Sequence, residues 1–203
     1  MPIIPSSRRS PAIRSVTSLA GTVKAQAVTL GAPLAVSWAA LGANAVLGGA
    51  LNRFGIVPRT VDGLWGILFA PFLHGSVAHL VANSISLLVL GWVVLAFAGH
   101  RRFWFVSAAA ALGAGLCAWT LGAPGSVHIG ASGVIFGYLG YLMLSGWFAR
   151  RVWPMLLSLG VTAMWGGMVL GVLPGQLGIS WQAHLGGFIG GVWAARRLHA
   201  RGK

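Results

Sequence analysis

The side chains best suited to chemistry in this 203-residue sequence are one serine, Ser132, and a few histidines and amides at regular spacings. Ser132 lies in the stretch GASG at the start of an apolar run. A serine inside a membrane helix usually bonds back to its own preceding turn. At a helix start, however, the first-turn N–H groups lack intrahelical partners and favour negative charge. The position of Ser132 therefore predicts a place where an oxyanion is stabilised, although Val134 excludes the G-x-S-x-G turn of soluble hydrolases.

A second polar group lies in the stretch HGSVAHLVAN. His79 and Asn83 are four residues apart and share one face of a helix, while His74 lies five residues earlier at a loop boundary. Polar side chains at membrane depth are costly unless they are satisfied. This face is therefore either a functional site or a polar contact between helices, and the spacing alone leaves both interpretations open.

A third candidate is His184, in the stretch WQAHLGGFIGGVWA. Taken alone, it is most simply a histidine satisfied by its neighbours. Its helix and the helix that begins at Ser132 each carry a glycine face, which allows two helices to approach backbone to backbone. These faces consist of Gly133, Gly137 and Gly140 on one helix and Gly187 and Gly191 on the other. Because Ser132 and His184 begin their helices at the same membrane side, this packing is expected to bring hydroxyl and imidazole within reach.

The composition narrows the chemistry further. Asp62 is the only acidic residue, against 14 lysines and arginines. Without a glutamate, an HExxH zinc protease site is impossible, and a single acid excludes a paired-carboxylate site. The lone cysteine, Cys117, cannot form an intrachain disulfide. Serine, histidine and amide chemistry remains, and it needs no metal or organic cofactor.

With 57% hydrophobic and 7% charged residues, the chain has the composition of a multi-pass membrane protein. Six apolar runs approach the roughly 20 residues that cross about 30 Å of hydrocarbon. These runs are residues 28–50, 78–98, 103–121, 132–148, 152–171 and 181–197. The sequence therefore predicts an all-α bundle of six transmembrane helices.

The positive charges lie in small clusters between these runs. Twelve fall in the two tails and the loops on their side, whereas the opposite side holds only Arg53 and Arg59. This asymmetry predicts that both termini are cytoplasmic, in a cell or inner membrane, and removes the main argument for nucleic-acid binding. We expect a basic tail over 1–27, a six-helix domain over 28–197 and a second basic tail over 198–203. The Arg- and Ser-rich start also fits an organellar transit peptide, which is the alternative interpretation of that tail.

The longest non-cytoplasmic connection, residues 51–77, is neither a clean span nor a polar loop. It is expected to be an amphipathic element embedded partly in the membrane interface. The side chains expected to face the interface are Trp65, Leu68, Phe69, Phe72 and Leu73.

In this order and on six predicted spans, the three polar stretches resemble the rhomboid family of intramembrane serine proteases. The resemblance covers roughly residues 53–195 and rests on HGSVAHLVAN, GASG and AHLGGFIGG. It implies a six-helix bundle with a membrane-embedded first loop and a serine endopeptidase acting on transmembrane segments of other proteins. It further implies lateral approach of the substrate between the second and fifth spans.

The resemblance also assigns roles to single residues. Ser132 would be the nucleophile and His184 the general base. Asn83, His79 and the Ser132 N–H would form the oxyanion hole, with Gly130 shaping the turn and His74 beside the site. Asp62, in the first loop, is badly placed to act as a triad aspartate, which favours a Ser-His dyad.

Two positions depart from the family pattern. Phe136 stands where a tyrosine is common, so this position keeps an aromatic ring but lacks the tyrosine hydroxyl. In the first loop, where some members of the family have a Trp-Arg pair, this chain has Trp65-Gly66. Two other functions compete with the protease: a catalytically silent rhomboid-like protein that binds membrane clients, and a small transporter that uses its histidines as a proton relay.

Overall fold

The structure is a computed structural model that describes residues 11–176 and 178–199. Over these residues the secondary structure is helical, with one isolated bridge between Ile56 and His128. In chain order the elements are α1 (Pro11–Val46), η1 (Ala50–Phe54), α2 (Val61–Phe69), η2 (Ala70–Phe72), α3 (Val77–Ala98), α4 (His100–Leu121), α5 (Ser132–Ala149), α6 (Val152–Trp165), η3 (Gly166–Val172) and α7 (Trp181–His199). The predicted all-α membrane architecture is confirmed.

Within the described part of the chain, five segments are long and apolar enough to cross a membrane: Gly21–Val46, Val77–Ala98, His100–Leu121, Ser132–Ala149 and Val152–Val172. The predicted sixth span, 181–197, corresponds to α7, which does not meet that criterion. Its four glycines contribute little hydrophobicity, and Arg196 and Arg197 lie in its last turn. Its burial against other helices makes lipid-facing hydrophobic side chains less necessary.

The first span differs from its predicted bounds of 28–50. Helix α1 begins at Pro11, so residues 11–27 of the expected tail are helical, and it ends at Val46. Gly48 and Gly49 then take positive φ angles of 59° and 87°, a conformation that terminates helices. The remaining tail residues, 1–10 and 200–203, lie outside the described part of the chain.

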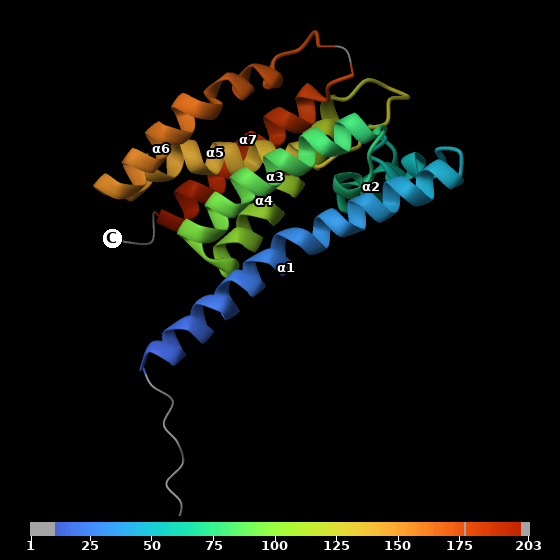
Figure 1. Cartoon of the computed structure of the whole chain (residues 1–203). Helices are drawn as coiled ribbons and strands as arrows, with labels where there is room; N and C mark the ends of the chain where they lie inside the picture. Colours follow the sequence, from blue (N-terminus) through green and yellow to red (C-terminus); the bar gives the residue numbers. More distant parts are fainter. Residues whose placement is uncertain (1–10, 177, 200–203) are drawn as a thin grey trace, which may run out of the picture.

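Helices α4, α5 and α7 form the centre of the bundle, with α1 lying against α3 at one side and α6 against α5 at the other (Figure 1). The contact between α5 and α7 is made by backbone. A Cβ atom on Gly187 would overlap the carbonyl oxygen of Gly133, and one on Gly191 would overlap that of Gly137. The glycine-to-glycine packing expected from the sequence is present.

A second glycine face of α7 packs against α4. A Cβ atom on Gly186 would overlap the carbonyl oxygen of Gly113, and one on Gly190 would overlap that of Ala109. Helix α7 is therefore clamped between two helices, and larger side chains on either face would separate them. The sequence analysis identified only the α5 side.

The connection between α1 and α3 folds as the short elements η1, α2 and η2 beside α4. Trp65, Leu68 and Phe69 are exposed on α2 and Phe72 is half-buried, as an interfacial element requires. Leu73 is an exception, because it is 7% exposed and points into the protein. It follows η2 in an extended conformation, which turns its side chain away from the outward face.

There is a steric reason for glycine at position 66, where some members of the resembled family have arginine. A Cβ atom at this position would overlap the carbonyl oxygen of Gly55 in the preceding segment. Two further hydrogen bonds fix the loop on α4: Trp119 Nε1 donates to the Thr60 carbonyl over 2.8 Å and Arg59 Nη1 to the Thr120 carbonyl over 2.9 Å.

Candidate active site

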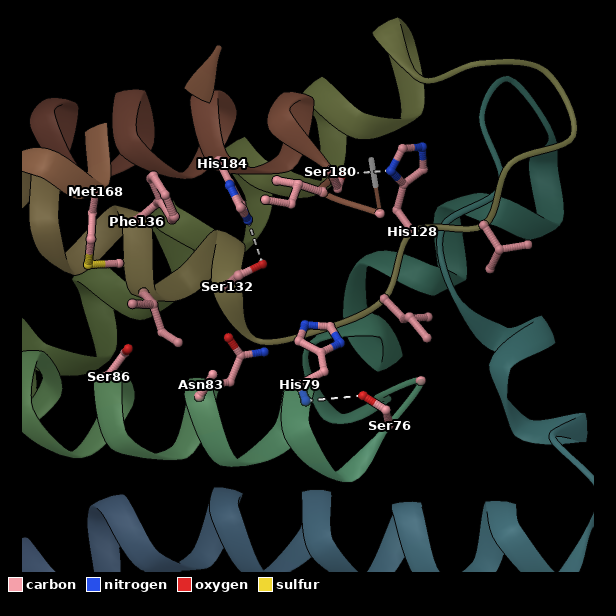
Figure 2. A pocket seen from close by; sticks show the side chains of 17 residues that line it. Ser76, His79, Asn83, Ser86, His128, Ser132, Phe136, Met168, Ser180 and His184 are labelled. Atoms are coloured by element: carbon pink, nitrogen blue, oxygen red, sulfur yellow. Dashed lines mark hydrogen bonds between the residues drawn. The ribbon is translucent and has the colours of Figure 1, made fainter. Parts of the chain in front are cut away.

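A serine and a histidine 52 residues apart meet between α5 and α7. Ser132 Oγ lies 2.8 Å from His184 Nε2. Figure 2 shows the imidazole of His184 above the hydroxyl, with both side chains at the edge of a cavity. Ser132 is half-buried and His184 is 7% exposed, so the pair is shielded from bulk solvent but open on one side.

The loop before α5 determines where Ser132 lies. Gly130 has φ of 117°, a backbone conformation that side-chain-bearing residues rarely adopt, and its N–H donates to the Ala70 carbonyl over 2.8 Å. Ser132 then begins α5, so its own N–H belongs to the unpaired first turn. A Cβ atom on Gly130 would stand 2.7 Å from His79 Cε1, which leaves glycine as the residue that fits here.

The imidazole of His184 is held from behind by backbone. Its Nδ1 lies 3.0 Å from the carbonyl oxygen of Gly171 in η3. A carbonyl only accepts hydrogen bonds, so Nδ1 carries the proton and Nε2 presents its lone pair to the Ser132 hydroxyl. This tautomer is the one a general base needs, and no carboxylate takes part.

The ring of Phe136 stacks on His184, with ring centroids 4.0 Å apart and planes inclined by 10°. Gly171 also approaches this ring, since a Cβ atom there would stand 2.8 Å from Phe136 Cζ and 3.4 Å from His184 Nδ1. The imidazole is therefore fixed by a stacked ring on its face and by a carbonyl at its Nδ1 edge.

Across the cavity, Asn83 and His79 point from α3 toward Ser132 (Figure 2). Asn83 Nδ2 lies 2.9 Å from His74 Nε2, and His74 Nδ1 lies 3.4 Å from the Phe72 carbonyl. His74 lies before α3 and is 1% exposed, and its burial, with the nearby His79, lowers its pKa to about 4. Neutral His74 accepts one Asn83 N–H, and the second N–H of that amide is left for a ligand.

A third histidine of the cavity, His128, was not expected from the sequence. His128 Nδ1 lies 2.6 Å from Ser180 Oγ, and its Nε2 lies 3.0 Å from Ser126 Oγ. Burial lowers the pKa of His128, so the ring is held in its neutral form. The bond to Ser180 ties the loop before α5 to the start of α7, four residues before His184, and the bond to Ser126 lies within the loop. Only the tertiary fold brings these side chains together, and no sequence motif marks them.

The cavity has a volume of about 710 Å³ and extends from Ser132 and His184 along α3 and η3. Apolar groups such as Ile135 and Met168 line it together with the polar groups of Ser132, His184, His79 and Asn83. Residues of α3 and, through Met168, of η3 line the cavity, and α6 packs on α5 and η3. The arrangement suits an extended, largely apolar ligand with one reactive carbonyl.

These observations define a multi-pass helical membrane protein with a serine-histidine pair at the edge of a cavity lined by both polar and apolar groups. The rhomboid domain family model matches residues 61–201, and the chain belongs to the rhomboid family. The expected rhomboid-like helical bundle is thereby confirmed.

Three relatives illustrate this membership. The uncharacterized protein Rv1337 of Mycobacterium tuberculosis is 45% identical over 161 residues, which cover 75% of this chain and 67% of that protein. RHOMBOID-like protein 4 of Arabidopsis thaliana is 30% identical over 135 residues, or 64% of this chain and 33% of that protein. Rhomboid protease GluP of Bacillus subtilis is 31% identical over 145 residues, or 68% of this chain and 27% of that protein.

Proposed function

We propose that this protein is an intramembrane serine endopeptidase of the rhomboid type, hydrolysing peptide bonds in or near transmembrane segments of membrane proteins. The observation that carries the proposal is the 2.8 Å contact between Ser132 Oγ and His184 Nε2, with Nδ1 held on the Gly171 carbonyl. Because Ser132 is the first residue of α5, its own helix offers no carbonyl four residues earlier for the hydroxyl to bond.

In the first half-reaction Ser132 Oγ attacks the scissile carbonyl carbon while its proton moves to His184 Nε2. The carbonyl oxygen becomes an oxyanion, which accepts hydrogen bonds from the free Asn83 N–H, from His79 and from the Ser132 N–H. His184 then donates its proton to the amide nitrogen, and the C–N bond breaks. The products are the amine half of the substrate and an ester of Ser132.

In the second half-reaction water reaches the ester through the open side of the cavity. His184 takes a proton from the water as its oxygen attacks the acyl carbon, and returns it to Ser132 Oγ as the ester bond breaks. The acyl half leaves as a carboxylate. Both steps require water near the end of a membrane protein, and the half-exposed Ser132 supports such access.

The substrates are membrane proteins that approach laterally between α3 and the α6–η3 segment, the second and fifth predicted spans, from which Ser86 and Met168 line the cavity. Because an intact helix hides its carbonyl groups, the substrate segment must unwind locally, which favours small or helix-breaking residues at the cut. The enzyme acts in a cell or inner membrane, near the face opposite its cytoplasmic termini.

A fluorophosphonate probe tests the nucleophile directly, because it is attacked by an activated serine and leaves a stable adduct. The purified protein is expected to be labelled on Ser132, with labelling abolished in Ser132→Ala and reduced at least 100-fold in His184→Ala, within the range that general-base catalysis contributes. Peptide mapping of the adduct distinguishes Ser132 from Ser180, which also lies beside a histidine.

Ser86→Ala provides a matched control, because Ser86 lines the same cavity without a bond to the catalytic pair. This variant is expected to keep the wild-type labelling rate. Cleavage of a reconstituted transmembrane substrate, with mass-spectrometric mapping of the cut, then tests the reaction itself. A folded wild-type protein that neither labels nor cleaves contradicts the proposal and favours the client-binding alternative.

A further inference from the structure

A second cavity lies at the opposite end of the bundle from the candidate active site. It has a volume of about 480 Å³ and is lined by the last turns of α3, α5 and α7 and the first turns of α4 and α6. In Figure 1 these helix ends lie near the C-terminal end of α7, away from the loops that hold Ser132 and His184. The proposed protease mechanism makes no use of this cavity.

The polar wall of this cavity is cationic. Arg102 at the start of α4, Arg151 at the start of α6 and His199 at the end of α7 all line it, and both arginines lie close enough to His199 for their charges to interact. Among the described residues no acidic side chain supplies a counter-ion here, because the only acidic side chain of the sequence, Asp62, lies on α2. Gathered cations without an acidic partner favour an anionic ligand.

The rest of the wall is apolar and faces outward. Phe97 at the end of α3 is 68% exposed, Trp153 at the start of α6 is 80% exposed, and Leu157 is half-buried one turn further along. Tryptophan is enriched where membrane proteins cross the boundary between headgroups and hydrocarbon. A soluble anion would occupy the cationic wall but leave this apolar surface uncovered.

We propose that the cavity is a binding site for an anionic phospholipid. The phosphate lies between Arg102 and Arg151, whose planar guanidinium groups suit bidentate phosphate binding, and an acyl chain lies along Phe97, Trp153 and Leu157. The lipid joins α4 to α6, two helices with little direct contact, because α6 packs almost entirely on α5 and η3. It therefore stabilises the outermost helix of the bundle independently of catalysis.

Native mass spectrometry of the full chain, delipidated in detergent, measures this binding directly. Phosphatidylglycerol is expected to bind with a stoichiometry near one, and phosphatidylcholine of the same acyl chains at least tenfold more weakly. The Arg102→Gln/Arg151→Gln double variant is expected to lose at least tenfold in phosphatidylglycerol affinity. Both arginines are exposed, so the variant keeps its folded core, and its circular dichroism checks this.

The matched control is Arg196→Gln/Arg197→Gln, which removes the same charge from the end of α7 outside the cavity lining. It is expected to bind phosphatidylglycerol like the wild type and to show the same lipid-induced rise in Tm. Equal losses in both double variants, or equal binding of the two lipids, would mean general charge attraction and overturn the proposal. Displacement of the lipid by millimolar inorganic phosphate or glycerol phosphate would mean a soluble-anion site and would also overturn it.

Discussion

At the scale of single residues, the candidate site replaces the carboxylate of a catalytic triad with a backbone carbonyl. The Gly171 carbonyl accepts from His184 Nδ1 over 3.0 Å and so selects the tautomer that a triad aspartate selects elsewhere. A carbonyl carries no net charge and is therefore less costly to bury than an unpaired carboxylate. This difference suits a chain that has one acidic residue and keeps it away from the site.

The first residue-scale prediction concerns Gly171. Gly171→Ala is expected to lower the rate of fluorophosphonate labelling about tenfold or more, because its Cβ atom would stand 2.8 Å from Phe136 Cζ. Overpacking of this kind costs about 1 to 3 kcal/mol, and 1.4 kcal/mol corresponds to a tenfold change in rate. Gly167→Ala is the control, since a Cβ atom there meets nothing within 4 Å. Equal rates in both variants would show that Gly171 has no positioning role.

The second residue-scale prediction concerns pH. The pKa of His74 lies at about 4 in the folded protein and near 6.5 in an unfolded chain. Between these values the unfolded state binds a proton that the folded state does not, so the free energy of unfolding falls as the pH drops from 6.5 to 4. The shift corresponds to about 3 kcal/mol from this group.

His74→Gln removes the titrating group, so the stability difference between wild type and variant is expected to depend on pH only within this window. The other histidines titrate in both proteins and cancel in that difference. Unfolding in detergent between pH 4 and 8 measures it. A difference that is constant across the whole range would contradict the assignment of a neutral, buried His74.

At the scale of secondary-structure elements, the close packing of the α7 glycine faces determines whether Ser132 and His184 can come within hydrogen-bond distance. A Cβ atom at Gly187 would overlap the carbonyl of Gly133, the residue directly after Ser132. Any side chain on this face therefore moves the start of α5 away from α7. The distance between Ser132 Oγ and His184 Nε2 depends directly on this separation.

Gly187→Val is accordingly expected to lower both labelling and stability. Overpacking by about 1 to 3 kcal/mol corresponds to a fall in Tm of roughly 2 to 10 °C for a chain of this size. Gly160→Ala is the matched control, because Gly160 lies in α6 with nothing within 4 Å of a Cβ atom, and alanine is the better helix former. Thermal unfolding in detergent measures both variants, and a normal Tm with full labelling in Gly187→Val would refute close packing at this point.

The sequence predicts those features that leave a side-chain pattern. The depth of Ser132 and His184 and the glycine face of α5 follow from spacing alone, and the structure brings these residues together. Gly171 was not predictable, because a carbonyl acceptor leaves no trace in the sequence. The His128–Ser180 bond depends on two loops 52 residues apart, and Leu73 turns inward only because η2 ends just before it.

Whether a feature leaves a side-chain pattern also explains which membrane spans could be predicted. Four helices follow from apolar runs, since α3, α4, α5 and the α6–η3 segment agree with prediction within a few residues. The change from the α-helix α6 to the 3-10 helix η3 at Gly166 was not predicted. This change places the Gly171 carbonyl oxygen beside His184 Nδ1. In helix α7 the glycines that make the contacts with α4 and α5 contribute little hydrophobicity, so this helix does not meet the length and hydropathy criterion for a membrane span.

At the scale of the whole molecule, the two cavities lie at opposite ends of the bundle. The candidate active site lies at the end of the bundle that carries Arg53 and Arg59. The cationic cavity lies at the end that carries Arg101, Arg102, Arg150, Arg151, Arg196 and Arg197. The positive-inside rule assigns the second end to the cytoplasm. The proposed cleavage then occurs near the outer face of the membrane and the proposed lipid site lies in the cytoplasmic leaflet.

This orientation predicts which loops are accessible from outside a cell. Cys117 is the only cysteine, so Cys117→Ala provides a background without thiols. In this cysteine-free background, Ala123→Cys places an exposed thiol in the loop before α5, and Arg101→Cys places one in the first turn of α4. A membrane-impermeant maleimide is expected to label the Ala123 variant in intact cells and the Arg101 variant only after permeabilisation. Arg101→Cys leaves eleven positive residues against two, so the charge bias keeps its direction. The opposite labelling pattern would reverse the topology and, with it, the membrane face at which substrates are cut.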